Sequence, residues 1–326
     1  MKIIRDIDNI PEDLTGSIVT IGNFDGVHLG HRKIFRNIVK EAGERNKKSV
    51  VITFDPHPQK IIHPERRPFF LLTPLNEKLD LIRSCDVDAV ILITFSIEFA
   101  EITAGEFVEN ILWGKLRLSK LLVGYDYVFG KGKGGDAEFL KTSGRKLGFQ
   151  VEEIDAVKTD GMISSSTGIR LAILDGNVRQ ASEMLGRPYG VTGTVVKGYR
   201  RGTDIGYPTA NIKSEKVIPA TGVYAIIAEL EGIRHQGVIN IGYNPTFGNE
   251  EISAEVHLLD FEGDIYGRDI TVLFIDRLRD EMKFKGPEEL ARQIKRDVEK
   301  AREILSSRAE DKESGTDLNP APTAKR

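Results

Sequence analysis

Two histidines, His28 and His31, stand three residues apart in the stretch IVTIGNFDGVHLGHRKIF, residues 18–35. Apolar residues before the turn predict a strand, and the apolar periodicity after it predicts a helix. Ligands of open α/β sheets bind where a strand leads into a helix, and the amides of the first helical turn attract anions. Imidazoles at this spacing can both donate hydrogen bonds to a phosphate. The stretch predicts a site for transfer at phosphorus, with a structural histidine pair as the alternative.

A second stretch, ISSSTGIR at residues 163–170, combines serine hydroxyls with a guanidinium. Hydroxyls can contact phosphate oxygens, and Gly168 opens the start of a helix. Arg170 can hold a phosphate through two parallel hydrogen bonds. A serine run alone is more typical of a loop. Together with the histidine pair, it predicts a phosphate site built from two distant segments.

Further candidates lie in the second half of the chain. In ISAEVHLLDF, residues 252–261, apolar residues alternate, which predicts a strand with Glu255 and His257 on the face away from the core. A carboxylate on the outward face of a strand is usually only solvated, so the pattern alone gives Glu255 no role. The segment GYRRGTDIGYPTANI, residues 198–212, has by itself the composition of a turn.

The expected secondary structure that must position these residues differs between the two halves of the chain. Up to about residue 185, strand patterns alternate with helical patterns, which predicts a doubly wound parallel α/β sheet with helices on both faces. We expect strands at residues 17–22, 49–54, 89–95, 120–124 and 149–154, and helices after the histidine pair, at 105–116 and at 137–148.

After residue 186 the strand signals follow one another without helices between them, which predicts a small antiparallel β-barrel. The expected strands cover residues 191–198, 222–230, 234–242, 252–261 and 269–278. A closing helix is expected from Pro287 to about residue 305, with its apolar residues on one side. Residues 306–326 are polar and aperiodic, which predicts a disordered tail. We therefore expect two domains, at residues 1–185 and 186–305.

Composition excludes several classes of protein. The formal net charge is -3 and the pI about 6.1, so nothing global indicates a nucleic acid or an anionic membrane as the partner. Cys85 is the only cysteine, which rules out an intrachain disulfide and fits a reducing compartment. The amino-terminal segment has no apolar run typical of a signal peptide, and no segment approaches a membrane span. We expect a cytoplasmic protein that binds small molecules, as a monomer or a weak homo-oligomer.

The motifs together resemble a known family. GNFDGVHLGH and ISSSTGIR resemble the HxGH and ISSTxIR signatures of the adenylyl- and cytidylyltransferase superfamily. The resemblance narrows to the first domain of the bacterial bifunctional riboflavin kinase/FAD synthetases through TFDPHP (53–58), LTPLNEKLDLI (72–82), FAEITAGEFVENIL (99–112) and VGYDYVFGKGKGGD (123–136). The chain beyond residue 186 resembles their kinase domain, so the resemblance covers residues 15–305 in order. One departure is Gly168, where many relatives carry a side chain.

The resemblance implies which residues bind substrates in the first domain. The nucleotide would be held by Gly22, Asn23, Phe24, Gly26, His28, His31, Ser164, Ser165 and Arg170. Of these, His28, His31 and Arg170 would also stabilise the charge that develops at the α-phosphorus. His57, between two prolines at the end of an expected strand, and Asp126 would lie near the flavin.

In the second domain the resemblance implies a PTAN motif that places Mg²⁺ and the phosphates of ATP. Thr209 and Asn211 would be the metal ligands, and Gly206 would allow the nucleotide to approach closely. Glu255 would be the catalytic base. Arg279 and Phe284 would lie beside the flavin, although Phe284 could equally anchor the closing helix.

The implied reactions are phosphorylation of riboflavin to FMN by Mg·ATP and adenylylation of FMN by a second ATP, which gives FAD and pyrophosphate. Neither step needs a covalent enzyme intermediate. Two rivals are an enzyme with one degenerate domain and a flavin-binding regulator without turnover. Gly130, Gly132 and Gly135 match a dinucleotide-binding fingerprint, but they do not directly follow a strand, so an NAD site is not expected.

Overall fold

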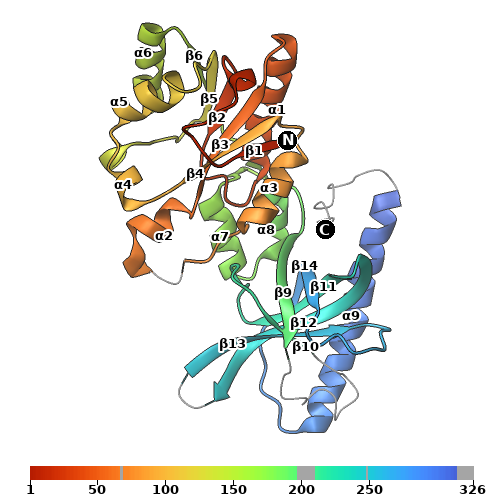
Figure 1. The fold of residues 1–326 in the computed structure, drawn as a ribbon. Helices are drawn as coiled ribbons and strands as arrows, with labels where there is room; N and C mark the ends of the chain where they lie inside the picture. The colour runs from red at the N-terminus through yellow and green to blue at the C-terminus, as the bar shows by residue number, and fades with distance from the viewer. Residues whose placement is uncertain (67–68, 197–209, 247–248, 314–326) are drawn as a thin grey trace. The chain divides into compact units, whose positions relative to one another are not determined.

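The computed structural model describes residues 1–66, 69–196, 210–246 and 249–313 (Figure 1). Residue contacts divide the chain into two compact units, one from Met1 to Ser164 and one that begins at Ser165. Each unit has its own sheet and its own buried apolar core.

The first unit is built on a parallel sheet with the strand order β1-β4-β3-β2-β5-β6. Its strands are β1 (Lys2–Ile4), β2 (Ile18–Ile21), β3 (Ser49–Asp55), β4 (Ala89–Thr94), β5 (Lys120–Gly124) and β6 (Gln150–Ile154). The chain moves from β2 to β3 and β4 on one side and then returns to place β5 on the other side. The direction of winding therefore reverses between β2 and β5. Ligands of such sheets bind at the carboxyl ends of the strands at this switch point.

Helices cover both faces of this sheet, because successive residues of each strand point to opposite sides. Ile18 packs in the core that includes α1 (Leu29–Glu44) and α3 (Leu75–Arg83). Val19 packs in the other core, with the π-helix η3 (Phe107–Trp113) and α6 (Ala137–Leu147). Shorter elements complete the unit: η1 (Glu12–Leu14), α2 (Pro58–Ile62), η2 (Pro64–Arg66), α4 (Ile97–Ala100), α5 (Ala104–Glu106), η4 (Lys131–Lys133), β7 (Lys158–Thr159) and β8 (Met162–Ile163).

The second unit is a closed antiparallel barrel with the strand order β10-β13-β12-β11-β14-β9. Its strands are β9 (Tyr189–Val196), β10 (Ala210–Lys213), β11 (Gly222–Leu230), β12 (Ile233–Thr246), β13 (Asn249–Leu258) and β14 (Asp269–Arg279). The closing helix α9 (Pro287–Glu313) buries Ala301 and Leu305 in a core shared with Val223 and Ala225 of β11.

Helices α7 (Ser166–Leu174) and α8 (Val178–Leu185) fold with the barrel. Ala220 N donates a hydrogen bond to Ile173 O at 3.2 Å. Between the two helices, Gly176 has a φ of 77°, and a Cβ there would lie 2.8 Å from Tyr224 Oη. Glycine therefore lets this turn press against β11. The division at Ser165 and the expected boundary at residue 185 differ by these two helices.

The predicted fold class is confirmed: a doubly wound parallel sheet is followed by a small antiparallel barrel and a C-terminal helix. The helix expected over 105–116 is split between α5 and η3. Helix α9 continues to Glu313, so residues 306–313, expected in the disordered tail, are helical. The reason is that Arg, Ala, Glu and Lys in SSRAEDKE favour helix and no glycine or proline interrupts them before Gly315.

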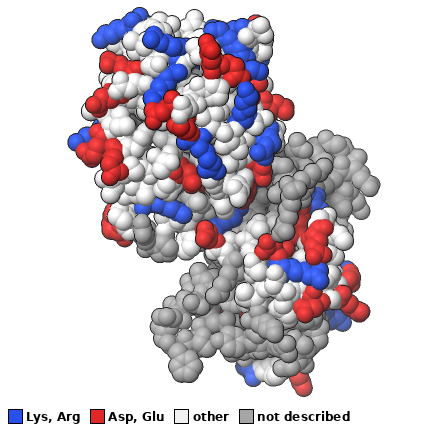
Figure 2. Space-filling model, viewed as in Figure 1, with Lys and Arg blue, Asp and Glu red and all other residues white. Residues whose placement is uncertain are grey.

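The surface carries charges of both signs. Figure 2 shows acidic and basic side chains interspersed over the visible face of the first unit, as the small net charge predicts. In the described part of the chain, none of the helices combines the length and the apolar character needed to cross a membrane.

Candidate active sites

The turn between β2 and α1 has an unusual backbone conformation. Phe24, Gly26 and Val27 have φ values of 49°, 87° and 41°. Such a conformation is strained for phenylalanine and more so for a β-branched valine, and strain of this kind gathers at ligand sites. Phe24 and Val27 are both buried, so core packing holds the turn in place. A Cβ at Gly22 would lie 3.0 Å from the Phe24 ring. The turn delivers His28 to the N-cap position of α1.

Asp25 ties this turn to the segment that precedes α3. Its buried carboxylate accepts hydrogen bonds from Leu72 N at 3.1 Å, from Thr73 N at 3.0 Å and from Thr73 Oγ1 at 3.2 Å. Thr73 Oγ1 in turn accepts a hydrogen bond from Gly26 N at 2.9 Å. A buried carboxylate needs such donors, and here they fix the turn.

The rings of His28 and His31 stack, with their centroids 3.6 Å apart and an interplanar angle of 25°. The Phe24 ring meets His31 edge-on at 5.1 Å. Burial, and then the neighbouring charges of His28 and Lys78, hold the pKa of His31 well below its usual range. His31 is therefore a neutral imidazole at neutral pH, able to donate one hydrogen bond and accept another. Within the described residues, His31 Nδ1 has no hydrogen-bond partner.

The depressed pKa of His31 predicts that folding stability falls in acid. In the unfolded chain His31 binds a proton with a pKa near the ordinary 6.5, whereas in the folded chain its pKa is well below that value. The free energy of unfolding is therefore highest above pH 6.5 and decreases as the pH falls toward the pKa of the folded state. The measurement is thermal unfolding of the wild type and of His31→Gln across this range. We expect the wild type to lose stability relative to the variant as the pH falls. A difference between them that does not change with pH would contradict this.

The second phosphate motif begins beside the first. A Cβ at Gly30 would lie 3.0 Å from the His28 ring and 3.4 Å from Ser164 O. The glycine between the two histidines therefore allows the chain at Ser164 to approach the first turn of α1. Ser164 is 4% exposed, and its Oγ lies 3.2 Å from Thr159 Oγ1. The structure thus brings HLGH and the start of ISSSTGIR together.

The rest of that motif forms the start of α7. Ser165 is the N-cap residue, and its Oγ accepts a hydrogen bond from Gly168 N at 3.1 Å. Because this contact uses the backbone, a glycine at position 168 keeps it. Arg170 is half-buried, and its Nη1 lies 3.5 Å from Ser166 O. The roles of Ser165 and Arg170 toward phosphate stay predictions.

The loops that follow β3 and β5 carry the two residues expected near the flavin. His57 is the N-cap residue of α2: its Nδ1 accepts a hydrogen bond from Gln59 N at 3.2 Å, and its ring lies 4.9 Å from that of Phe69. Asp126 is exposed in the loop after β5, the neighbour of β2. Both loops leave carboxyl ends of parallel strands, the edge at which the histidine pair lies, and contact with the flavin stays a prediction.

Lys78 is a further candidate: it lies inside the motif LTPLNEKLDLI, but no role was predicted for it from the sequence. It is 6% exposed, and its Nζ donates hydrogen bonds to Asn23 O at 3.3 Å, Thr53 Oγ1 at 3.1 Å and Phe54 O at 3.2 Å. Burial lowers the pKa of Lys78 to about 8, against the opposing effect of nearby carboxylates. The signal that could have found it is a lysine on the inward stripe of α3, whose apolar members are Leu75, Leu79 and Ile82.

The barrel brings three oxygen-bearing side chains together. Asn211 of β10 pairs directly with Glu255 of β13. Ser253 Oγ lies 2.8 Å from Asn211 Oδ1 and 3.2 Å from Glu255 Oε1. Along β13, Ala254 and Val256 are buried, as the alternation predicts. The residues that alternate with them are half-buried: Ser253, Glu255 and His257. Ser253 was missed as a site residue, although the same alternation places it on the face of Glu255.

This group fits a hard cation. The amide oxygen of Asn211 and the hydroxyl of Ser253 are neutral ligands that suit Mg²⁺ in a site shared with nucleotide phosphates. Thr209 and Gly206, also expected here, lie outside the described residues. Among the residues that are described, no cluster of three or more His, Cys, Asp or Glu side chains could hold a metal ion. A cation at Asn211 would therefore depend on neutral oxygens and on ATP for its remaining ligands.

Arg279 fastens α9 to the barrel. Its Nε and Nη2 donate hydrogen bonds to Asp297 Oδ2 at 3.0 and 2.8 Å, and its Nη1 donates to Asp280 O at 2.9 Å. Asp297, on α9, is 5% exposed. The Phe284 ring lies 5.7 Å from the guanidinium. The bonds to Asp297 give Arg279 a structural role, and a flavin contact by Arg279 or Phe284 stays a prediction.

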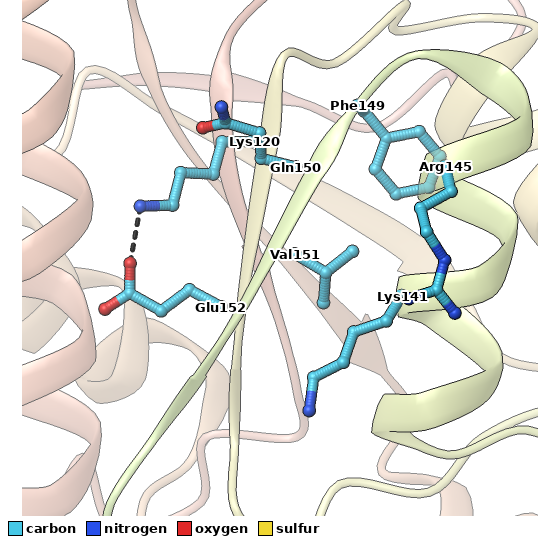
Figure 3. Close-up of a pocket in the computed structure, with 7 residues that line it drawn as sticks. All are labelled: Lys120, Lys141, Arg145, Phe149, Gln150, Val151 and Glu152. Carbon is cyan, nitrogen blue, oxygen red and sulfur yellow. Dashed lines mark hydrogen bonds and ion pairs between the residues drawn. The ribbon is translucent and has the colours of Figure 1, made fainter.

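A cavity on the first unit belongs to neither group of residues (Figure 3). It is lined by Lys120, Lys141, Arg145, Phe149, Gln150, Val151 and Glu152. Lys120 is paired there with Glu152 and with Glu41. Because Lys120 and Gln150 are the first residues of β5 and β6, this cavity lies at the amino ends of the strands. Parallel sheets bind their ligands at the other end.

Comparison with known proteins decides the family. Residues 10–168 match the family model described as FAD synthetase, and residues 185–305 match the one described as riboflavin kinase. The bifunctional riboflavin kinase/FMN adenylyltransferase of Escherichia coli K12 is 39% identical over 310 residues, which are 94% of this chain and 98% of that protein. The chain belongs to the bifunctional riboflavin kinase/FMN adenylyltransferase family.

Two other proteins are similar to this chain over nearly its whole length. The family's protein from Pseudomonas fluorescens is 37% identical over 311 residues, which are 95% of this chain and 99% of that protein. A solved structure, described as a macrolide-efflux protein from Streptococcus pneumoniae, has a TM-score of 0.83 and 35% identity, and covers 92% of this chain and 98% of its own. The predicted activities are confirmed by family membership: the chain is a riboflavin kinase and an FMN adenylyltransferase that uses ATP to make FAD.

Proposed function

We propose that residues 1–185 carry out adenylylation and residues 186–305 carry out phosphorylation, in line with the two family models. The observation that carries the first assignment is the stacked pair His28–His31 at the start of α1, beside Ser164 and at the switch point of the sheet. Separate replacement of His31 and Glu255 tests the assignment, because each variant should lose one step only.

In the adenylylation step, a phosphate oxygen of FMN forms a bond to the α-phosphorus of ATP, and the bond from that phosphorus to pyrophosphate breaks. His31 donates a hydrogen bond to an oxygen on which charge develops, and His28 assists it. The first amides of α1 add an anion site, to which Gly22 and Gly26 allow close approach.

We assign the remaining expected residues of the first domain to the nucleotide and the flavin. Asn23 and Phe24 shape the nucleotide side of the turn. Ser164, Ser165 and Arg170 hold the β- and γ-phosphates, with the guanidinium making two parallel hydrogen bonds. His57 and Asp126 contact the flavin from the loops that follow β3 and β5.

In the phosphorylation step, Glu255 accepts the proton of the terminal ribityl hydroxyl as that oxygen forms a bond to the γ-phosphorus of ATP. The bond from the γ-phosphorus to the bridging oxygen breaks, and ADP leaves. Ser253 orients the carboxylate. Thr209 and Asn211 would hold Mg²⁺, which when bound neutralises charge on the phosphates. Gly206 lets the nucleotide approach, and Arg279 and Phe284 border the flavin.

The metal assignment predicts that Asn211→Ala raises the Mg²⁺ concentration needed for half-maximal riboflavin phosphorylation by about tenfold, the cost of losing one oxygen ligand. Adenylylation of added FMN by the same variant should keep its wild-type Mg²⁺ dependence. The matched control is Asn240→Ala, because Asn240 pairs with Glu255 from the opposite strand, β12, and is exposed. An equal shift in both variants would contradict the assignment.

We also propose that the enzyme works in the cytoplasm, as a monomer or a weak homo-oligomer. Support comes from its single cysteine, Cys85, which is free and half-buried, and from its ATP and flavin substrates. Sedimentation should give a mass near 36.3 kDa at low protein concentration. A stable higher mass would contradict the proposal.

A further inference from the structure

The carboxyl ends of β2 and β3 are joined by a buried lysine from α3. The ammonium of Lys78 donates to Asn23 O, Thr53 Oγ1 and Phe54 O, all within 3.3 Å. An ammonium has three donors, so these acceptors use them all. Asn23 lies in the turn that leads to the histidine pair, whereas Thr53 and Phe54 lead into the loop that carries His57. Lys78 therefore joins the turn after β2 to the end of β3 through hydrogen bonds.

The hydrogen bond from Lys78 to Asn23 O lies at the start of the turn between β2 and α1. Thr53 Oγ1 also donates to Asn23 O, at 3.2 Å, so one carbonyl of the turn accepts hydrogen bonds from both Thr53 and Lys78. The next residue, Phe24, is the first with a left-handed φ. A shift of the Asn23 carbonyl would therefore change the backbone conformation of the strained segment that ends at His28.

Stability does not explain a lysine at this position. Lys78 lies on the inward stripe of α3 between buried apolar residues, where leucine or methionine would pack without a desolvation cost. The carboxylates of Asp25 and Asp55 act on it through charge, but burial is the larger effect on its pKa. Burying the Lys78 ammonium therefore costs folding free energy, and all three of its hydrogen bonds are to residues in or next to the two loops.

We propose that Lys78 is a positioning residue for adenylylation, which fixes the turn of residues 22–28 against the loop of residues 53–58 so that the histidine pair meets the α-phosphate. The proposal rests on the assignment of that pair to the adenylylation site. Lys78 acts through Asn23 and Thr53 and does not touch the substrate. Its charge also favours the neutral form of His31.

The test is Lys78→Met, which keeps an unbranched side chain one atom shorter and removes its donors and its charge. We expect kcat for adenylylation of FMN to fall about 100-fold, as for a misplacement of about 1 Å. The KM for FMN should change by less than about threefold, because flavin contacts are retained. Riboflavin phosphorylation by the same protein is the internal control and should stay at the wild-type rate. Adenylylation within about twofold of the wild type would overturn the proposal.

Lys120→Met is the matched control variant. Lys120 is a second buried lysine of the first unit, 8% exposed. It lies on β5 and contacts Glu41 and Glu152 at the amino ends of the strands. This variant should keep adenylylation within about twofold of the wild type, whatever its effect on thermal unfolding. Equal loss of adenylylation in both variants would show a general effect of removing a buried lysine and would overturn the proposal.

A pH profile separates positioning from packing. Lys78 faces Asp25 in the turn, Asp55 at the end of β3 and His31 on α1. As the pH rises through about 8, the ammonium loses its proton and one of its three donors, so wild-type kcat for adenylylation should fall. The residual rate of Lys78→Met should show no such alkaline limb, and a retained limb would overturn the proposal.

Two variants distinguish a wrong role for Lys78 from a wrong assignment of the histidine pair. If His31→Ala abolishes adenylylation while Lys78→Met leaves it intact, the site stands and the positioning role falls. If His31→Ala also leaves adenylylation intact, the site assignment itself falls, and the role of Lys78 falls with it.

Discussion

Replacing Glu255 with glutamine should abolish riboflavin phosphorylation and leave adenylylation of FMN intact. Glutamine keeps the size of the side chain and can still accept a hydrogen bond from Ser253, but it cannot take up the proton of the attacking hydroxyl. A general base contributes 10² to 10⁴ in rate, so we expect kcat for phosphorylation to fall by about 10³. The result would identify Glu255 as the base, because its contacts in the barrel are otherwise preserved.

The two substrates separate the two steps in one assay. Glu255→Gln given riboflavin and ATP should form neither FMN nor FAD, whereas the same protein given FMN should form FAD at the wild-type rate. His257→Gln is the control, because His257 lies two residues along β13 on the same face. It should keep phosphorylation within about threefold of the wild type. Wild-type phosphorylation by Glu255→Gln would exclude the base assignment.

His31→Ala should produce the opposite defect, in which FMN accumulates and FAD does not form. His31 is a neutral donor held by stacking on His28 and by the edge of Phe24, so its removal takes away a preorganised hydrogen bond at the α-phosphate. Loss of one such donor costs about 10² to 10³ in kcat. Riboflavin phosphorylation should be unchanged.

The control for this variant is His63→Ala. His63 lies on the same unit, at the end of α2, and its Nδ1 is 3.1 Å from Glu65 Oε1 at the surface. Its removal should leave the ratio of FAD to FMN unchanged in chromatography of the products. If His31→Ala and His63→Ala behave alike, the histidine pair does not take part in adenylylation.

Much of the fold could be predicted because the local sequence of most strands is typical of a strand. Residues 120–124 and 222–230 are apolar runs with clear ends, and their observed bounds are those predicted. The strand β1 was missed because three residues are too short for periodicity, and it forms by pairing with β4. The strand β10 was missed because YPTAN has the composition of a turn, and it is a strand through pairing with β9 and β13.

Candidate site residues could be proposed from the sequence where residue types and spacing suggest a chemistry, as in HLGH. Residues that act through distant partners could not be found that way. Asp25 bonds to Leu72 and Thr73, and Lys78 bonds to Asn23, so their roles exist only once β2, β3 and α3 are assembled. Arg279 is a similar case. It was expected beside the flavin because RLRDEMKF resembles the segment that closes over the flavin, and its bonds to Asp297 of α9 could not be inferred from that resemblance.

The most direct test of the bifunctional assignment is chromatography of the flavins formed when the purified chain is incubated with riboflavin, ATP and Mg²⁺. We predict that FMN forms first and that FAD follows as FMN is consumed, with one pyrophosphate released for each FAD. FMN alone would contradict the role given to the histidine pair, and the absence of any new flavin would contradict both active sites.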